Sequence, residues 1–493
     1  MNNSLAFLIV LYVPLMLSAQ PIPLAQRLHD THDTYREGTL TQRRFKHKDV
    51  QALIQARQGN PLYEITQVGE SFEGRAITML KVGHGPHTAL LWTQMHGDEP
   101  TATMAIFDML NFLESQNDGF DELRKQLLDS TTLYIVPMLN PDGAERYQRR
   151  TAQGIDMNRD ALYLQTPEGR ILKELQQTLK PEFGFNLHDQ SPRYSAGRSP
   201  KVATISFLAT AYDYDRNINP VREKSMKMIV RMNRLLQLFI PGQVARYADD
   251  HEPRAFGDNV QKWGTTLILI ESGGYLGDPE KQYIRKLNFV AILSGLSAVA
   301  DGTLAAENRD DYYQIPENGR YVFDLLVRNA TVKQGTKSYQ TDLGINRNEV
   351  NYANATKFFT YSKVEEYGDL STHYGSEEIN AEGYVVERGR VYPTPLKNIS
   401  EAAKLNPIEL WKQGYTYLTV LSDASARRNL GLYFTVQPFH ILRSAAAPAA
   451  APDLGDTATF LLKKNGKVQY VVINGYVHDV NKPFKKIGNG IVE

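Results

Sequence analysis

The chain of 493 residues contains no cysteine, and its 55 basic and 55 acidic residues leave no net charge. Without cysteine, disulfides, a thiol nucleophile and thiolate metal ligands are all excluded. The balanced charge gives no indication of binding to nucleic acid or to an anionic membrane surface. Hydrophobic residues make up 42% of the chain, which is enough for a sizeable core, and the length is typical of two or three domains.

An apolar segment at residues 5–18 is followed by Ala19, so small residues stand where a signal peptidase would cut. The segment is interrupted by Pro14 and is shorter than the roughly 20 residues of a membrane-spanning helix. We therefore expect a signal peptide over residues 1–19, an exported bacterial protein, periplasmic or secreted, and no membrane span in the mature chain. Because no Lys or Arg precedes the apolar segment, a buried N-terminal element is the alternative.

Apolar strand-like runs alternate with helix-like stretches from about residue 64 to residue 300. Strands are predicted at residues 87–93, 132–139, 183–187 and 266–270. Such runs, separated by helices, are typical of an α/β fold with a doubly wound mixed sheet that is covered on both faces. The predicted first domain spans residues 20–304.

Beyond residue 305 the pattern changes to short β-branched runs separated by turn residues. This composition predicts a smaller all-β C-terminal region over residues 305–493, with an Ala/Pro-rich linker at residues 444–452. Within this region Asn465-Gly466 stands between two apolar runs, which indicates a β-hairpin with a type I′ turn.

Several predicted strands of the first domain are followed by polar residues, namely His96 and Glu99, Asn140, His188 and Glu271. In open α/β sheets the binding site forms beyond the carboxyl ends of the strands, so these side chains are expected at one edge. His96 and Glu99 lie at a strand end and in a first helical turn, where an imidazole and a carboxylate can converge on a zinc ion. Taken singly, this pair also fits a surface contact, and His188 also fits a core histidine.

The same residues belong to a longer series of motifs: His96-Gly-Asp-Glu99, Asn140-Pro-Asp-Gly143, Gly154-Ile-Asp-Met-Asn158-Arg159, His188 and Ile270-Glu271-Ser272. In their order and rough spacing, residues 64–300 resemble the zinc carboxypeptidase family, the carboxypeptidase A/B-like metallopeptidases. The resemblance implies one catalytic zinc per chain in a doubly wound α/β domain. It also implies hydrolysis of the C-terminal peptide bond of a peptide by Glu-assisted attack of zinc-bound water.

The resemblance assigns roles to the residues at the predicted edge of the sheet. His96, Glu99 and His188 would be the zinc ligands, which leaves the fourth position open for water. Glu271 would be the general base, taking a proton during attack and passing it to the leaving amine. Asp156 would orient the imidazole of His96 from outside the ligand shell.

The resemblance also assigns the substrate-binding residues. Asn158 and Arg159 would bind the terminal carboxylate, a task for which the two-pronged guanidinium is suited. Arg149 would stabilise the developing oxyanion, although Arg150 is adjacent and the register could differ by one. The family's active-site tyrosine has no clear counterpart, and Tyr247 is the candidate, within a long insertion at about residues 190–262. The expected partner is thus a peptide with a free C-terminus.

Two alternatives stay open from the sequence. A related zinc-dependent amide hydrolase, acting on cell-wall peptides or acyl-amino acids, would keep the zinc and Glu271. A degenerate peptidase could instead serve as a binding module, with the β-region as the binding part. Two further pairs of histidines, His29 with His32 and His84 with His87, are expected to be solvated and not to bind metal.

Overall fold

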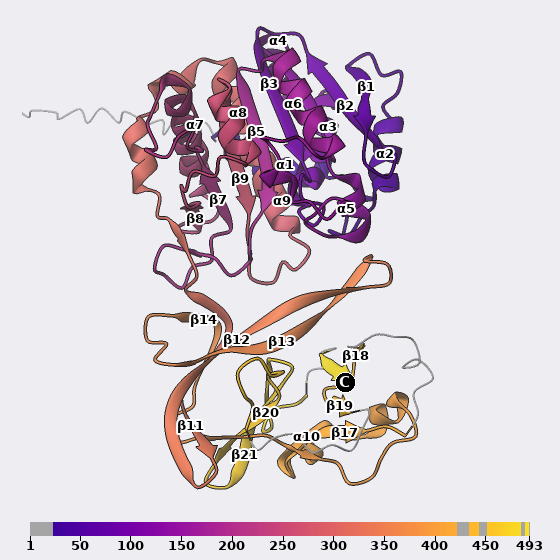
Figure 1. The fold of residues 1–493 in the computed structure, drawn as a ribbon, viewed down its shortest axis with the longest axis vertical. Helices are drawn as coiled ribbons and strands as arrows, with labels where there is room; N and C mark the ends of the chain where they lie inside the picture. The colour runs from indigo at the N-terminus through magenta and orange to yellow at the C-terminus, as the bar shows by residue number, and fades with distance from the viewer. Residues whose placement is uncertain (1–22, 422–432, 443–450, 485–488, 493) are drawn as a thin grey trace, which may run out of the picture.

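The computed structural model describes residues 23–421, 433–442, 451–484 and 489–492. Its ribbon forms two stacked parts, an α/β region up to about residue 304 and a β-region after it (Figure 1). The predicted signal peptide at residues 1–19 lies outside the described residues, and so do residues 444–450 of the predicted linker.

The α/β region is built on one mixed sheet of eight strands in the order β1-β2-β4-β3-β5-β9-β7-β8. Its central strands β4, β3, β5 and β9 run parallel, while β1, β2 and β7 join through antiparallel pairs. The strands are β1 (Tyr63–Glu70), β2 (Ala76–Gly83), β3 (His87–Thr93), β4 (Thr131–Val136), β5 (Phe183–Asp189), β7 (Ile205–Leu208), β8 (Val244–Arg246) and β9 (Thr266–Ser272).

Helices cover both faces of this sheet, which confirms the doubly wound prediction. Alternate side chains of β3 point to opposite faces, so that Leu91 enters one core while Leu90 and Trp92 enter the other. The first core contains α1 (Leu24–Tyr35), α3 (Thr101–Glu114), α4 (Asp121–Ser130), α7 (Pro220–Leu236) and α9 (Gln282–Ala300). The second contains α6 (Pro167–Leu179) and α8 (Phe256–Lys262). The short helices α2 (His47–Gln55) and α5 (Pro141–Arg146) contact each other and add buried residues to the first core.

Helix α9 is long and apolar enough to cross a membrane, alone among the helices in the described part of the chain. However, 83% of its apolar window is buried, because it packs against α1, α3 and α7. It is therefore the central helix of the first core.

The four histidines expected to be solvated differ in their surroundings, and His29 is only 19% exposed because its ring stacks on Phe239, with 4.2 Å between the ring centroids. The side chains of His84 and His87 are 76% and 43% exposed, as predicted. The prediction is wrong for His32, which is buried against Phe289 with its Nε2 2.8 Å from Asp108 Oδ2. The reason is that α1 turns this side chain towards α3 and α9, where a buried carboxylate gives the imidazole a partner.

The β-region consists mainly of two sheets. The larger contains β11 (Val322–Gln334), β12 (Lys337–Tyr352), β13 (Lys357–Gly368), β14 (Tyr374–Asn380), β15 (Val385–Glu387), β20 (Phe460–Lys464), β21 (Lys467–Ile473) and β22 (Tyr476–Asp479). The smaller contains β16 (Arg390–Val391), β17 (Tyr415–Thr419), β18 (Tyr433–Thr435), β19 (His440–Leu442) and β23 (Gly490–Val492). A short helix, α10 (Pro407–Lys412), packs on β17 and β21, so the region is not purely β.

The predicted hairpin is present between β20 and β21. Asn465 and Gly466 have φ angles of +52° and +73°, as both central residues of a type I′ turn require. A small two-stranded sheet, β6 (Ser195–Ala196) with β10 (Asn318–Gly319), connects the insertion of the α/β region to the start of the β-region.

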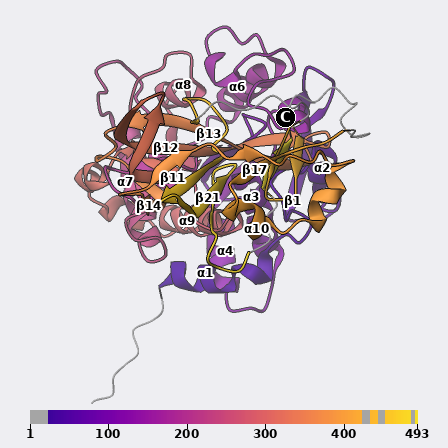
Figure 2. The same ribbon diagram turned by 90° about the horizontal axis from the view of Figure 1, so that it is seen from below.

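The β-region docks on the carboxyl edge of the α/β sheet, as the views from the side and from below show (Figures 1 and 2). Glu349 on β12 accepts hydrogen bonds from Arg43 at 2.5 Å and from Arg44 at 2.7 Å. Arg193, in the insertion, pairs with Asp324 on β11 at 3.2 Å. The edge where the sequence predicts the site is therefore bordered by the second part of the chain.

Candidate metal centre

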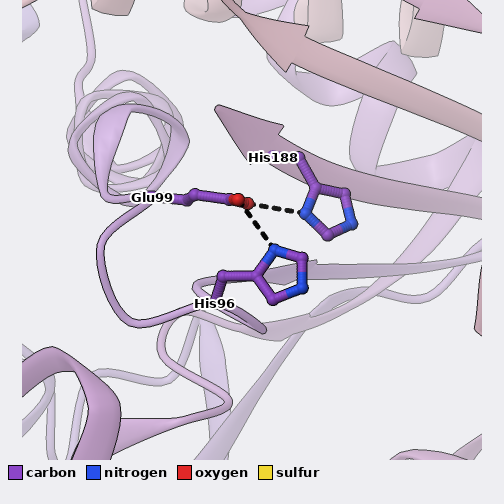
Figure 3. Close-up of side chains that lie close together, drawn as sticks. All are labelled: His96, Glu99 and His188. Atoms are coloured by element: carbon purple, nitrogen blue, oxygen red, sulfur yellow. Dashed lines mark hydrogen bonds and ion pairs between the residues drawn. The ribbon is translucent and has the colours of Figure 1, made fainter. Parts of the chain in front are cut away.

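Three of the predicted residues converge at the carboxyl ends of β3 and β5. Glu99 Oε1 lies 2.7 Å from His96 Nδ1, and Glu99 Oε2 lies 2.6 Å from His188 Nδ1 (Figure 3). One potential ligand atom from each of the three residues falls within 4.8 Å of the others, and all three residues are buried. The predicted ligand set is thus brought together by the fold.

These residues fit a zinc ion by the chemistry of their donors. Two imidazole nitrogens and one carboxylate are a donor set of catalytic zinc sites, in which a fourth position is left for water or substrate. The far nitrogen of His96, Nε2, lies 3.3 Å from Asp156 Oδ1, as expected for a carboxylate that fixes the ring from outside. Although burial raises the pKa of Glu99, the two imidazoles more than offset this and hold its pKa below the usual range, so that it is an anionic ligand.

Gly97 allows the loop that carries His96 and Glu99 to pack directly against the backbone of Gly143. A Cβ on Gly97 would lie 2.0 Å from the carbonyl carbon of Gly143, in the Asn140-Pro-Asp-Gly motif. Asn140 caps α5 by accepting from the Gly143 N–H at 2.9 Å, and its own amide donates to Met95 O at 3.2 Å. The two motifs therefore brace each other, and the role of Asn140 is to hold the ligand loop.

Glu271 lies on β9 directly opposite His188 of β5 in the register of the sheet. Its side chain is buried, and Oε2 has no hydrogen-bond partner among the described residues. Burial raises its pKa well above the usual range, and the charges of Glu99 and Asp189 raise it further. A carboxylate of raised pKa beside a metal-ligand set can accept and hold a proton.

Arg149 is the arginine that faces the candidate site. Its Nε donates to Asp156 Oδ2 at 2.9 Å, and its Nη1 lies 3.1 Å from His96 Nδ1 and 3.4 Å from Glu99 Oε1. Arg150 instead donates to Gly154 O at 3.0 Å, within its own loop. Of the two adjacent arginines, Arg149 is therefore the one that contacts the predicted ligand residues, and Arg150 is not.

Asn158 and Arg159 lie in a single turn of 3-10 helix, Met157–Arg159, that follows Asp156. Asn158 Oδ1 accepts from the backbone of Phe256, and Arg159 lies 3.3 Å from Glu252 Oε2. The described contacts place neither side chain against the three ligand residues. They lie next to the site along the chain, with the guanidinium of Arg159 partly exposed to solvent.

Tyr247, the candidate for the family's tyrosine, follows β8 and stacks edge-on with Tyr194, with 6.1 Å between the ring centroids. Burial raises the pKa of its hydroxyl above the usual range, and the charge of Glu271 raises it further. The backbone N–H of Tyr247 donates to Phe207 O of β7 at 2.8 Å, and Phe207 pairs with Ile270 of β9, so the insertion brings Tyr247 to the strand pair that carries Glu271.

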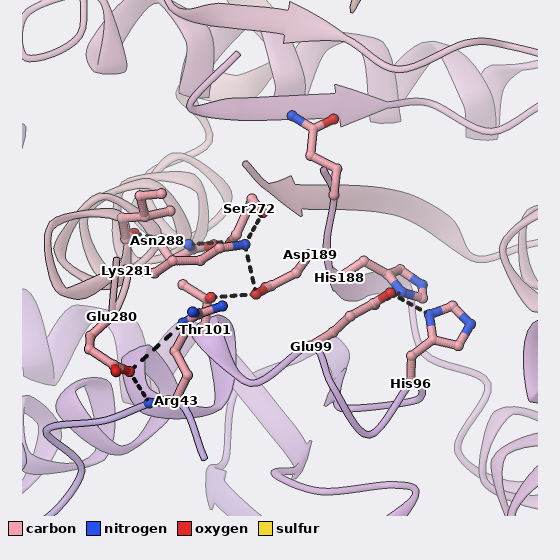
Figure 4. Close-up of polar contacts among 12 residues, drawn as sticks. Arg43, His96, Glu99, Thr101, His188, Asp189, Ser272, Glu280, Lys281 and Asn288 are labelled. Atoms are coloured by element: carbon pink, nitrogen blue, oxygen red, sulfur yellow. Dashed lines mark hydrogen bonds and ion pairs between the residues drawn. The ribbon is translucent and has the colours of Figure 1, made fainter. Parts of the chain in front are cut away.

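The sequence did not point to the buried ion pair beside the ligands. Asp189, next to His188, accepts from Lys281 Nζ at 3.0 Å and from Thr101 Oγ1 at 2.6 Å, while Lys281 also donates to Ser272 O at 2.8 Å (Figure 4). Asp189 was a visible neighbour of His188 in the sequence. Lys281 could not be predicted in this way, because it belongs to none of the motifs and stands at the end of a glycine-rich loop, ten positions after Glu271.

Comparison with known proteins agrees with this arrangement. A sequence model of the zinc carboxypeptidase family matches residues 50–201. A protein named Carboxypeptidase E from Caenorhabditis elegans is 31% identical over 341 residues, which cover 59% of this chain and 69% of that protein. The chain belongs to the zinc carboxypeptidase family.

Other relatives are matched over shorter segments. Carboxypeptidase 2 of Trichophyton tonsurans is 27% identical over 152 residues, and the match spans 29% of this chain and only 27% of that protein. Among solved structures, a metallo-carboxypeptidase from Burkholderia cenocepacia aligns with 52% of this chain and 70% of its own, at 16% identity and a TM-score of 0.43. The family is one of zinc-dependent metallopeptidases, which agrees with the His-Glu-His ligand set.

Proposed function

We propose that this protein is an exported zinc metallocarboxypeptidase that removes the C-terminal residue of peptides. The observation that carries the proposal is the convergence of three buried ligand atoms beside a buried carboxylate, Glu271, and a guanidinium, Arg149. Family membership supports the same chemistry. In this proposal residues 20–304 form the catalytic domain, residues 305–493 form an accessory domain, and residues 1–19 are removed on export.

His96, Glu99 and His188 would hold one zinc ion, with Asp156 fixing the ring of His96. When bound, zinc supplies Lewis acidity to the scissile carbonyl and makes water a stronger acid. Glu271 takes the proton released by the attacking water, because its raised pKa lets it hold that proton. It then delivers the proton to the nitrogen of the leaving amino acid.

Arg149 would donate hydrogen bonds to the oxygen of the scissile carbonyl as negative charge develops there. Its Nη1 already lies beside Glu99 and is oriented by the contact of its Nε with Asp156. Asn158 and Arg159 would bind the terminal carboxylate of the substrate, for which Arg159 must exchange its contact with Glu252. A free C-terminus is therefore a requirement of the proposed reaction.

The test compares peptides with free and amidated C-termini on wild-type enzyme and on Glu271→Gln. We expect release of the last residue only from the free C-terminus, and a loss of about 10²- to 10⁴-fold in kcat in the variant, because its amide cannot accept the proton. Zinc content, measured by metal analysis, is expected to stay near one per chain in both proteins.

Equal turnover of the amidated peptide would contradict a carboxypeptidase and favour the amide hydrolase. Full activity in Glu271→Gln would contradict the proposed role of Glu271. Bound zinc with no hydrolysis of either peptide would favour a protein that only binds.

A further inference from the structure

We infer that the β-region forms one wall of the substrate cleft, and that this cleft receives the residues on the N-terminal side of the scissile bond of an extended peptide. The inference rests on the proposed function and adds to it the length of substrate that the enzyme recognises. It also gives the accessory domain a direct part in substrate binding.

A cavity of about 620 Å³ lies between the two regions, a size within the usual range of ligand pockets. Glu99 and Asp189 line it from the α/β region. Glu349 of β12, Phe358 of β13 and Tyr476 of β22 line it from the β-region. A ligand held at the candidate metal centre and a ligand held against the β-region would therefore share one space.

The direction in which a substrate extends follows from the two nitrogens of His96. Nδ1 faces Glu99 and Nε2 faces Asp156, so these two carboxylates lie at opposite edges of the ring. The proposed carboxylate-binding residues, Asn158 and Arg159, adjoin Asp156 in the chain. A peptide whose terminal carboxylate is held there must leave the metal centre on the side of Glu99.

The side of Glu99 is the side on which the cavity lies. Figure 4 shows Asp189, Lys281 and Arg43 lying beyond Glu99, away from His96. All three residues line the cavity. The upstream part of a bound peptide would thus enter the space between the two regions.

The wall supplied by the β-region is fixed in place by Arg44. Its guanidinium lies between the rings of Tyr147 and Phe358, 4.1 Å from each centroid, and donates to Glu349 Oε2 at 2.7 Å and to Asn351 Oδ1 at 3.0 Å. One ring comes from each region, so the cation links them by stacking as well as by charge. A wall held in this way can contribute to recognition without first being ordered by the ligand.

The chemistry of the lining favours a peptide backbone over a charged group. Most of the charged side chains pair with one another, as Lys281 does with Asp189 at 3.0 Å and Arg193 with Asp324 at 3.2 Å. Little charge is therefore left to select an acidic or a basic side chain. An apolar side chain, Leu276, is 82% exposed in the loop that lines the cavity.

The same loop offers backbone donors. Within the part of the chain that the structure describes, no hydrogen bond engages the N–H groups of Gly274, Leu276 or Gly277. Peptide carbonyls are acceptors of matching chemistry. The occupant we assign to the cavity is accordingly the main chain of two or more uncharged residues upstream of the scissile bond.

The experiment measures kcat/KM for N-acylated di-, tri- and tetrapeptides that share their last two residues and have free C-termini. For the wild-type enzyme we expect kcat/KM to be about tenfold higher for the tetrapeptide than for the dipeptide, because the longer peptide makes additional binding contacts. Two variants alter the wall: Phe358→Ala removes a ring from it, and Ser376→Trp fills the cavity from an exposed position. Both are expected to reduce the tetrapeptide-to-dipeptide ratio towards one.

Matched controls are Tyr339→Ala and Ser338→Trp, at exposed positions of β12 outside the cavity lining, which should keep the wild-type ratio. If Phe358→Ala fails to fold, as judged by thermal unfolding, Ser376→Trp decides. An unchanged ratio in Ser376→Trp, or equal kcat/KM for all lengths in the wild type, overturns the inference and leaves the proposed function standing. Absence of hydrolysis of every peptide overturns the proposed function and the inference with it.

Discussion

Buried polar side chains are arranged differently in the two regions of the molecule. In the β-region they bond to the backbone of neighbouring strands: Asn474 accepts from the Ser362 N–H at 2.7 Å, and Asn489 donates to Ile473 O at 2.9 Å. In the α/β region the buried side chains of His96, Glu99 and His188 at the sheet edge bond to one another. Polar groups of the first kind stabilise a fold, whereas the second kind marks a place prepared for a ligand.

The strongest test of this contrast replaces one buried histidine in each region. We expect His96→Ala to lose zinc and to reduce peptide hydrolysis to background, because one of three ligands is removed. His478→Ala, in the β-region, removes a ring packed on Trp411 and should cost about 2–4 kcal/mol of unfolding free energy with zinc retained. Metal analysis and denaturant unfolding of both variants measure these outcomes. Retention of zinc by His96→Ala, or its loss from His478→Ala, would contradict the contrast.

A second test concerns the buried pair beside the ligands. Lys281→Met leaves Asp189 buried without its cation, and we expect the unfolding free energy to fall by about 3 kcal/mol. The control is Lys286→Met on α9, the helix that follows Lys281. Lys286 lies 3.5 Å from the exposed carboxylate of Asp33, so its replacement should cost less than about 1 kcal/mol. Equal losses in the two variants would show that Lys281 is not specifically paired.

A third test addresses the contact between the regions. Glu349→Gln removes the charge shared by Arg43 and Arg44 and should weaken docking by about 1–2 kcal/mol. In calorimetry, we expect the β-region of the variant to unfold at a lower temperature than that of the wild type. Glu366→Gln, at an exposed position of β13, is the matched control and should leave the transition unchanged.

The smallest effect expected is a dependence of this docking on pH. Burial raises the pKa of Glu349, but the two arginines more than offset it, so its pKa lies below the usual 4.5. Its contribution to stability is present above pH 4.5 and is lost as the pH falls towards the lower value of the folded state. Unfolding measured at pH 6 and pH 4 should show a larger acid destabilisation for the wild type than for Glu349→Gln. The same acid effect in both proteins would assign it to other groups.

The parts of the fold that sequence could predict are those set by local pattern. The apolar runs of β3, β5 and β9 identify buried parallel strands, and the residues directly after such strands must meet at one edge, which is why His96, His188 and Glu271 were found. Asn465-Gly466 likewise determines its own turn. In each case the local structure is determined by residues a few positions apart in the sequence.

What sequence could not supply depends on contacts between distant segments. Arg44 and Glu349 are 305 positions apart, and neither stands in a motif that indicates the other. The burial of His32 follows from Asp108, 76 positions away, and not from its neighbours on α1. The cavity between the regions is of the same kind, because its shape exists only after docking.

Glu99 and His188 meet at 2.6 Å although 89 positions separate them in the chain. An ion held by these two residues and His96 would bind only to the native state, because no single segment of the unfolded chain contains all three. By mass action, an ion present at 1,000 times its dissociation constant adds about 4 kcal/mol to the stability of such a fold. The quantity of intact protein is therefore expected to follow the free metal concentration of the compartment in which the chain folds.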